Sequence, residues 1–181
     1  MLVVFTVYVP RNSGLERFNY LVQGCFEEPI DCVMIRGETI PKIVDQFGEY
    51  GWTGNDLFQD YRASGLGQRI RVKYFVPWPG ETQPRLCLLG PEEITPPSFL
   101  DDMVLSAPSK YGNLTNQFLR RKGWNPTVLY GKGQVERQIR LGNADLAIDI
   151  VCSGRTIKED GLIIYETIFD DSGLVLLTKD I

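Results

Sequence analysis

The segment from Asp149 to Thr156, which reads DIVCSGRT, joins an acidic side chain to a Ser-Gly-Arg-Thr turn. Its hydroxyls and guanidinium are donors suited to a phosphate monoester, and Gly154 allows the backbone to approach an anion closely. A carboxylate beside a phosphate requires a partner, and sugar hydroxyls or magnesium are the natural ones for Asp149. The same residues also suit a plain turn between a buried strand and a surface helix, so the local pattern leaves both interpretations open.

Other junctions between expected strands and helices have the same character. In α/β folds, ligands bind at the carboxyl ends of strands and at the start of the helices that follow. The four junctions of this type lie at residues 10–13, 53–56, 109–115 and 153–156. Together they are predicted to form the ligand-facing edge of the protein.

Histidine is absent from the sequence. Mechanisms that need an imidazole base are therefore excluded, including the usual serine and cysteine hydrolase triads. The four cysteines form no CxxC pair, so no zinc site is expected. Cys32, Cys87 and Cys152 lie in apolar runs and are predicted to pack there as small hydrophobic residues.

The formal net charge of −4 argues against general nucleic-acid binding, which draws its affinity from a basic surface. The basic cluster at residues 120–122 is expected to be the cationic end of a helix. No run of about 18 apolar residues is present, so no membrane span is expected. The apolar N-terminal run lacks preceding basic residues and predicts a first strand of a cytoplasmic protein, not a signal peptide.

Strand and helix patterns alternate along the chain. Strands are expected at 2–10, 30–37, 50–54, 69–77, 85–91, 103–108, 127–131, 144–151 and 162–169, and the chain closes with an apolar segment at 173–181. Helices are expected at 13–25, 39–48, 55–64, 113–123, 134–142 and 155–161. A proline-rich stretch at 91–101 separates the two halves. This order predicts an α/β protein with two small mixed sheets, flanking helices and a cleft between two lobes.

The segment Glu136–Ile157 resembles the diagnostic stretch of the ATP phosphoribosyltransferase family, which catalyses the first step of histidine biosynthesis. The matching positions are Glu136, Gly142, Ala144-Asp145, Asp149-Ile150-Val151 and Ser153-Gly154-Arg155-Thr156. Other segments resemble the family in the same order, through Arg36, Ile40, Pro41, Gly51, Thr53, Gly54, Asp56, Lys110, Tyr111, Asn113, Leu114 and Thr115. Several ordered matches are far more specific than any one of them.

The resemblance implies a two-lobed fold like that of type II periplasmic binding proteins. Residues 1–94 with 168–181 would form the domain facing ATP and pyrophosphate, and residues 98–167 the domain holding the 5-phosphate. The implied reaction is transfer of the phosphoribosyl group from phosphoribosyl pyrophosphate to N1 of ATP. Magnesium would accompany the leaving pyrophosphate, and no protein metal ligands are implied.

The resemblance also assigns roles to individual residues. It implies catalytic roles for Glu136, Asp149 and Arg11. The implied substrate-binding residues are Ser153, Gly154, Arg155, Thr156, Lys110, Arg36, Thr53, Gly54 and Asp56. The resemblance further implies a short form of the family, which has no regulatory domain. Such a protein is expected to form a homo-oligomer, a dimer, and to work with a separate regulatory subunit that resembles histidyl-tRNA synthetase.

The chain departs from the family pattern on the side predicted to face ATP. The family's first loop usually reads Pro-Lys-Gly-Arg, whereas this chain has Pro-Arg-Asn-Ser at Pro10–Ser13. Thr39 replaces an aspartate, and Trp52 replaces a small residue expected beside the cleft. These departures keep two alternatives open: a non-catalytic protein that binds nucleotides or phosphosugars, and a phosphoribosyltransferase that uses another acceptor base.

Overall fold

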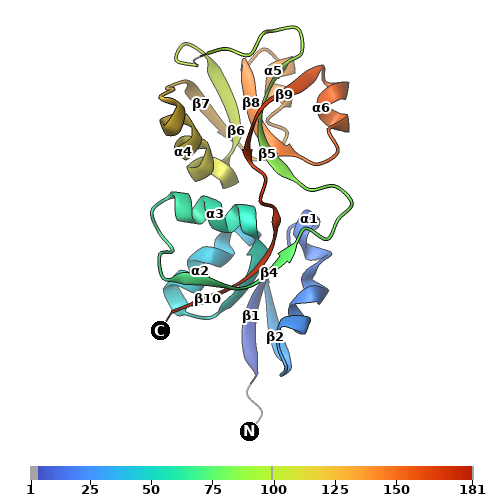
Figure 1. The fold of residues 1–181 in the computed structure, drawn as a ribbon, viewed down its shortest axis with the longest axis vertical. Coiled ribbons are helices and arrows are strands. Elements are labelled where there is room, and N and C mark those ends of the chain that lie inside the picture. The colour runs from blue at the N-terminus through green and yellow to red at the C-terminus, as the bar shows by residue number, and fades with distance from the viewer. Residues whose placement is uncertain (1–3, 99, 181) are drawn as a thin grey trace. The chain divides into compact units, whose positions relative to one another are not determined.

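A computed structural model of the chain describes residues 4–98 and 100–180 (Figure 1). The chain divides into two compact units, and it passes between them twice. Unit 1 runs to Pro79 and resumes at Ser172, whereas unit 2 comprises Gly80–Asp171. Each unit is built on one five-stranded sheet.

The sheet of unit 1 has the strand order β2-β1-β3-β10-β4. Its strands are β1 (Phe5–Pro10), β2 (Ile30–Ile35), β3 (Tyr50–Gly54), β4 (Ile70–Pro77) and β10 (Gly173–Lys179). Its helices are α1 (Ser13–Glu16), η1 (Asn19–Cys25), η2 (Gly37–Thr39), α2 (Ile40–Phe47) and α3 (Asn55–Ala63), of which η1 and η2 are 3₁₀ helices. Strands β1, β2 and β3 are parallel, while β10 runs antiparallel to β3 and β4.

Strand β10 forms the centre of the unit 1 core because both of its faces are covered. Leu174 and Leu176 pack with Trp52 on one face, and Val175 and Leu177 pack with residues of α2 and α3 on the other. Burial on both faces explains why this segment reads as a continuous apolar run instead of an alternating one.

The sheet of unit 2 repeats this arrangement in the order β7-β6-β8-β5-β9. Its strands are β5 (Arg85–Pro91), β6 (Val104–Pro108), β7 (Thr127–Gly131), β8 (Leu146–Val151) and β9 (Leu162–Phe169). Its helices are η3 (Ser109–Tyr111), α4 (Gly112–Lys122), α5 (Arg137–Arg140) and α6 (Arg155–Glu159), and η3 is a 3₁₀ helix. Strands β6, β7 and β8 are parallel, and β5 runs antiparallel to β8 and β9.

The two mixed sheets with flanking helices confirm the predicted fold class. The position of the first boundary differs from the expected one, which followed residue 94. It falls after Pro79 because β5 forms its hydrogen bonds with β8 and β9, inside the second sheet. The second boundary lies at 171/172, four residues later than expected.

Two helix predictions differ from the structure. The segment predicted as one helix at 13–25 contains the short helix α1 and the 3₁₀ helix η1. At the start of η1, the Asn19 side chain donates to the carbonyl of Pro10 at 2.9 Å, which ties this helix to the end of β1. The helix expected at 134–142 is limited to α5, and the left-handed backbone of Gln134 (φ 50°) precedes it.

The cysteine prediction holds for one residue of three. Cys87 is buried in the core of unit 2, but Cys32 and Cys152 are exposed. Cys32 lies on the edge strand β2, and Cys152 comes directly after the end of β8, so neither is enclosed. The basic cluster at residues 120–122 does lie in the last turn of α4, as expected. None of the helices within residues 4–98 and 100–180 has the length and apolar character needed to span a bilayer.

Trp52 offers a test of the unit 1 core because it is fully buried and its indole Nε1 has no hydrogen-bond partner among the described residues. Trp52→Phe removes an unpaired buried donor, which offsets part of the lost packing. We expect the free energy of unfolding of the Trp52→Phe variant to differ from that of the wild type by less than about 1.5 kcal/mol. Trp52→Ala should cost about 3–5 kcal/mol. Urea unfolding measures both, and equal losses in the two variants would contradict an unpaired indole.

Candidate functional site

Most of the predicted site residues of unit 2 lie at the carboxyl ends of its parallel strands. The register pairs Pro108 of β6 with Gly131 of β7, and Ser106 with Ala147 of β8, so these strands end at one edge. Lys110 follows β6, Glu136 follows β7, and Asp149 lies in the last part of β8. The topology thus brings together side chains that are up to 39 residues apart in the sequence.

Asp149 and Glu136 form a pair of half-buried carboxyl groups. Burial raises the pKa of Asp149 to about 7, and both the hydrogen bond with Glu136 and the charge of Glu136 add to this rise. Two carboxyl groups can share a hydrogen bond only when one of them holds a proton. Glu136 Oε2 is buried and has no hydrogen-bond partner within residues 4–98 and 100–180. Near neutral pH the pair is therefore poised to gain or lose one proton.

Two other groups act in the opposite direction on the same carboxyl. The backbone N–H of Ile150 donates to Asp149 Oδ1 at 2.7 Å, and the positive charge of Lys110 lies nearby. Both stabilise the carboxylate and lower the pKa of Asp149. The Lys110 side chain is exposed, with Nζ 4.9 Å from the centre of the Tyr111 ring. The edge thus carries an acid pair and a nearby cation.

The Ser-Gly-Arg-Thr turn connects β8 to α6. Gly154 adopts the left-handed conformation (φ 71°), which favours glycine over other residues. Ser153, Arg155 and Thr156 are exposed, and the N–H of Arg155 lies 3.4 Å from Ser153 Oγ. The turn therefore presents its hydroxyls and guanidinium to solvent next to the acid pair.

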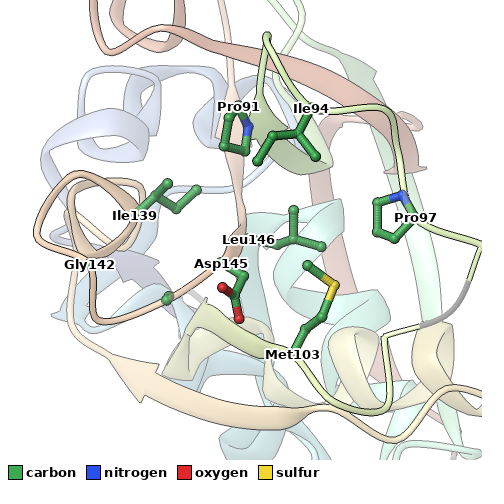
Figure 2. Close-up of a pocket in the computed structure, with 9 residues that line it drawn as sticks. Pro91, Ile94, Pro97, Met103, Ile139, Gly142, Asp145 and Leu146 are labelled. Carbon is green, nitrogen blue, oxygen red and sulfur yellow. The ribbon is translucent and has the colours of Figure 1, made fainter.

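Two of the hollows among the described residues of unit 2 lie at different edges of its sheet. The larger, of about 300 Å³, lies near the start of β8 and the end of β5 (Figure 2). Its lining is mainly apolar and includes none of the predicted site residues; the lining residues are Pro91, Ile94, Pro97, Met103, Ile139, Gly142, Ala144, Asp145 and Leu146. The smaller, of about 230 Å³, is lined by Ser106, Gln138 and residues near Glu136, at the edge that carries the acid pair.

The remaining predicted site residues lie in unit 1, again at the carboxyl ends of parallel strands. The register pairs Pro10 of β1 with Ile35 of β2, and Tyr8 with Gly51 of β3. Arg11 and Arg36 directly follow β1 and β2, and both side chains are exposed. The N–H of Arg11 donates to the carbonyl of Ile35 at 2.9 Å, which fixes the two loops side by side. Two guanidinium groups therefore arise from neighbouring loops.

Asn12 joins these loops through its side chain. Its Oδ1 accepts a hydrogen bond from the N–H of Gly37 at 2.7 Å, and its Nδ2 donates to Glu38 Oε2 at 3.2 Å. Glu38 Oε1 in turn lies 3.9 Å from an Arg36 nitrogen. Sequence reasoning treated Asn12 only as a departure from a pattern and missed Glu38, because no local spacing links residues 26 positions apart.

Thr53, Gly54 and Asp56 occupy the end of β3 and the first turn of α3. Thr53 is fully buried, and its hydroxyl donates to the carbonyl of Gly37 at 3.0 Å. A Cβ on Gly54 would lie 2.2 Å from Asp56 Oδ1, so the acid folds back closely over the glycine. Only glycine leaves room for this arrangement.

Trp52 and Thr39, the two departures from the family pattern that could affect the acceptor base, lie in different surroundings. Trp52 is fully buried in the unit 1 core, so the expectation that it lies beside a cleft is wrong. The β3 alternation turns its side chain toward Leu174 and Leu176. Thr39 is exposed and precedes α2. Trp52 therefore gives no support to the use of another acceptor.

A divalent cation fits this chain only with help from a ligand. The described residues include no group of three or more His, Cys, Asp or Glu that could hold a metal. The Asp149 and Glu136 pair provides carboxylate oxygens, but magnesium commonly completes its coordination with phosphate oxygens and water. The site therefore suits magnesium that arrives bound to a polyphosphate.

Comparison with known proteins identifies the relatives of the chain. The family model HisG, ATP phosphoribosyltransferase, matches residues 36–180. An ATP phosphoribosyltransferase from Listeria welshimeri is 33% identical over 169 residues, which span 93% of this chain and 74% of that protein. One from Maricaulis maris is 28% identical over 175 residues, and the match spans 58% of its length.

Solved structures agree at the level of the fold. An ATP phosphoribosyl transferase (HisG:HisZ) complex from Thermotoga maritima contains a chain that matches 97% of this one with a TM-score of 0.78 and 23% identity, over 87% of its own length. The periplasmic aliphatic sulphonate binding protein SsuA from Escherichia coli matches 97% of this chain with a TM-score of 0.60 and 16% identity, over 65% of its own length. The predicted two-lobed fold like that of periplasmic binding proteins is thereby confirmed.

The family model covers parts of both units, including the acid pair and the Ser-Gly-Arg-Thr turn, and it begins at Arg36, so Arg11 lies outside the match. The resemblance seen in separate segments of the sequence is therefore confirmed over most of the chain. The chain belongs to the ATP phosphoribosyltransferase family of glycosyltransferases, which catalyse the first step of histidine biosynthesis.

Proposed function

We propose that this chain transfers the phosphoribosyl group of phosphoribosyl pyrophosphate to N1 of ATP. The bond between C1 of the ribose and the pyrophosphate oxygen breaks, and a bond between C1 and N1 of adenine forms. The products are phosphoribosyl-ATP and pyrophosphate. Family membership supports this reaction, and the observation that carries the proposal is the acid pair next to the Ser-Gly-Arg-Thr turn at the edge of unit 2.

In this proposal the turn binds the 5-phosphate of the substrate. The exposed hydroxyls of Ser153 and Thr156 and the Arg155 guanidinium donate to the phosphate oxygens, and Gly154 permits close approach of the backbone. Asp149, in its ionised form, accepts hydrogen bonds from the ribose hydroxyls. Glu136 and Lys110 set the protonation state of Asp149, since both alter its pKa.

Unit 1 provides the groups for ATP and the departing pyrophosphate. Arg11 and Arg36 supply positive charge from neighbouring loops, and Thr53, Gly54 and Asp56 line the end of β3. Magnesium enters with pyrophosphate and neutralises part of its charge. Stabilising a departing polyanion and aligning N1 with C1 account for such a reaction without an imidazole base, which this sequence lacks.

We also propose that the chain acts as the catalytic subunit of a larger assembly in the cytoplasm. The Thermotoga maritima structure, described as a HisG:HisZ complex, supports an assembly with a second kind of subunit, and we propose that this subunit is regulatory and resembles histidyl-tRNA synthetase. A homodimer of this chain is expected within that assembly.

Formation of phosphoribosyl-ATP from ATP, phosphoribosyl pyrophosphate and magnesium tests the proposal directly. Thr156→Val removes one hydroxyl from the turn and keeps the size of the side chain. Losing a hydrogen bond to a charged group costs about 1.5–3 kcal/mol, so we expect the KM for phosphoribosyl pyrophosphate to rise by roughly tenfold to a hundredfold. Steady-state kinetics measures this change.

Thr127→Val is a matched control. Thr127 is also exposed, but it is the first residue of β7 and so lies at the end of that strand away from the acid pair. Its KM should stay within about twofold of the wild-type value. Absence of product, with and without the regulatory subunit, contradicts the catalytic proposal. Tight binding of phosphoribosyl pyrophosphate without turnover favours the non-catalytic alternative, and product only with a different base favours another acceptor.

The pH dependence of the reaction tests the acid pair. Because Asp149 must ionise to accept the ribose hydroxyls, kcat/KM for phosphoribosyl pyrophosphate should rise as pH increases through about 7. Glu136→Gln removes a negative charge that raises the pKa of Asp149, so the midpoint of the profile should move to lower pH. Lys110→Met removes a charge that lowers this pKa, and the midpoint should move to higher pH.

The two variants act as controls for each other, because a general loss of activity cannot move the midpoint in opposite directions. The raised pKa of Asp149 also affects folding. The ordinary pKa of this carboxyl is 3.8 and its pKa in the folded protein is about 7, so the free energy of unfolding should decrease as pH rises from 3.8 through about 7, because the folded state resists ionisation of Asp149. Urea unfolding of Glu136→Gln should show a weaker decrease. A midpoint that moves upward in Glu136→Gln would contradict the assigned pair.

A further inference from the structure

Asn12 precedes helix α1, where an asparagine side chain usually bonds to the first backbone N–H groups of the helix. The Asn12 side chain makes no such bond. It reaches instead across to the loop after β2, where it both accepts from Gly37 and donates to Glu38. Its side-chain bonds therefore serve the contact between two loops and not the helix that it precedes.

The contact satisfies the backbone N–H of Gly37, which has few other possible hydrogen-bond acceptors. Gly37 is buried, so its N–H needs an acceptor within the protein, and Asn12 Oδ1 provides one at 2.7 Å. The carbonyl of Gly37 is held as well, by the buried hydroxyl of Thr53 at 3.0 Å. The loop after β2 is thus bonded on one side to the β1 loop and on the other to the end of β3.

This hydrogen-bonded link lies between Arg11 and Arg36, which are two of the exposed arginines of unit 1. Arg11 immediately precedes Asn12, and Arg36 immediately precedes Gly37. Glu38 extends the link, since its two oxygens lie 3.2 Å from Asn12 Nδ2 and 3.9 Å from an Arg36 nitrogen. The backbone that carries both guanidinium groups is therefore fixed before any ligand binds, while the Arg36 side chain remains 62% exposed.

We infer that Asn12 is a positioning residue, which aligns Arg11 and Arg36 as a two-guanidinium receptor for a polyphosphate. Two cations on adjoining loops suit adjacent phosphates, and preorganised groups lose less freedom on binding. Both ends of the Asn12 amide are bonded within the protein, so we assign Asn12 to positioning and not to ligand binding. This role rests on the proposed function, and the polyphosphate is either the triphosphate of ATP or the pyrophosphate of the other substrate.

Three changes separate the two hydrogen bonds of Asn12. Asn12→Ala removes both of them. Asn12→Asp keeps an acceptor for the Gly37 N–H but sets a carboxylate against Glu38. The double variant Asn12→Asp with Glu38→Gln reverses the donor and acceptor of the second bond, and it preserves the net charge of the chain.

We expect Asn12→Ala and Asn12→Asp each to raise one KM by about tenfold, because the two arginines lose their alignment, with kcat changed by less than about twofold. The double variant should recover most of the affinity. A rise in the KM for ATP identifies the triphosphate as the ligand, and a rise in the KM for phosphoribosyl pyrophosphate identifies its pyrophosphate. Calorimetry with inorganic tripolyphosphate and pyrophosphate should show the same ranking of variants.

Asn19→Ala provides a matched control, because Asn19 also donates to the end of β1, at 2.9 Å, but has no bond to the Gly37 loop. Its Tm should fall without a change in either KM. The inference is overturned if Asn12→Ala lowers only Tm, or if the double variant binds no better than Asn12→Asp. Should Asn12→Ala fail to fold, the comparison of the double variant with Asn12→Asp decides.

The outcomes for this inference and for the transferase activity can be told apart. A wild-type protein that makes no product but binds polyphosphate in an Asn12-dependent way contradicts the activity and supports the positioning role. Turnover that is insensitive to Asn12 supports the activity and contradicts the positioning role. A protein that neither turns over nor binds polyphosphate contradicts both.

Discussion

The parallel alignment of three strands in each unit is the constraint on which the rest of the site depends. Parallel strands end at one edge, so the loops after β1, β2 and β3 meet, and so do those after β6, β7 and β8. Every side chain assigned to the proposed reaction lies in these loops, at the end of one of these strands or in the first turn of the helix that follows. The antiparallel strands β10 and β5 add buried apolar area and carry none of these side chains.

The same topology gives the two edges different charged groups, an acid pair in unit 2 and exposed arginines in unit 1. The edge of unit 2 has two half-buried acids, and burial, their shared hydrogen bond and their mutual repulsion keep a proton on the pair near neutral pH. The edge of unit 1 has two exposed arginines, and Glu38 lies close enough to one of them for an ion pair. Such a division suits a substrate with a neutral, hydroxyl-rich sugar and a leaving group of high negative charge.

Periodicity and local motifs predicted most of the fold, because the strands and helices here follow simple patterns of burial. The Ser-Gly-Arg-Thr turn was also predictable, since Gly154 adopts the backbone conformation that its residue type favours. Trp52 was misplaced beside a cleft, because strand alternation alone does not tell which face of a sheet with two covered faces receives a side chain. The exposure of Cys32 was missed for a related reason: an apolar run does not reveal that its strand lies at a sheet edge.

Contacts between distant loops could not be predicted from the sequence, and Asn12 shows why. Its residue type indicates a helix cap, and its bonds to Gly37 and Glu38 depend on the register of β1 against β2. A glycine at this position would leave the buried N–H of Gly37 without its acceptor, so the loop would need water or a ligand oxygen in place of the amide. Asn12 therefore supplies, from within the protein, the oxygen that a loop with glycine at this position would take from water or a ligand. For this reason the Pro10–Ser13 loop can hold an anion site although it lacks the glycine and the second cation of the family's Pro-Lys-Gly-Arg loop.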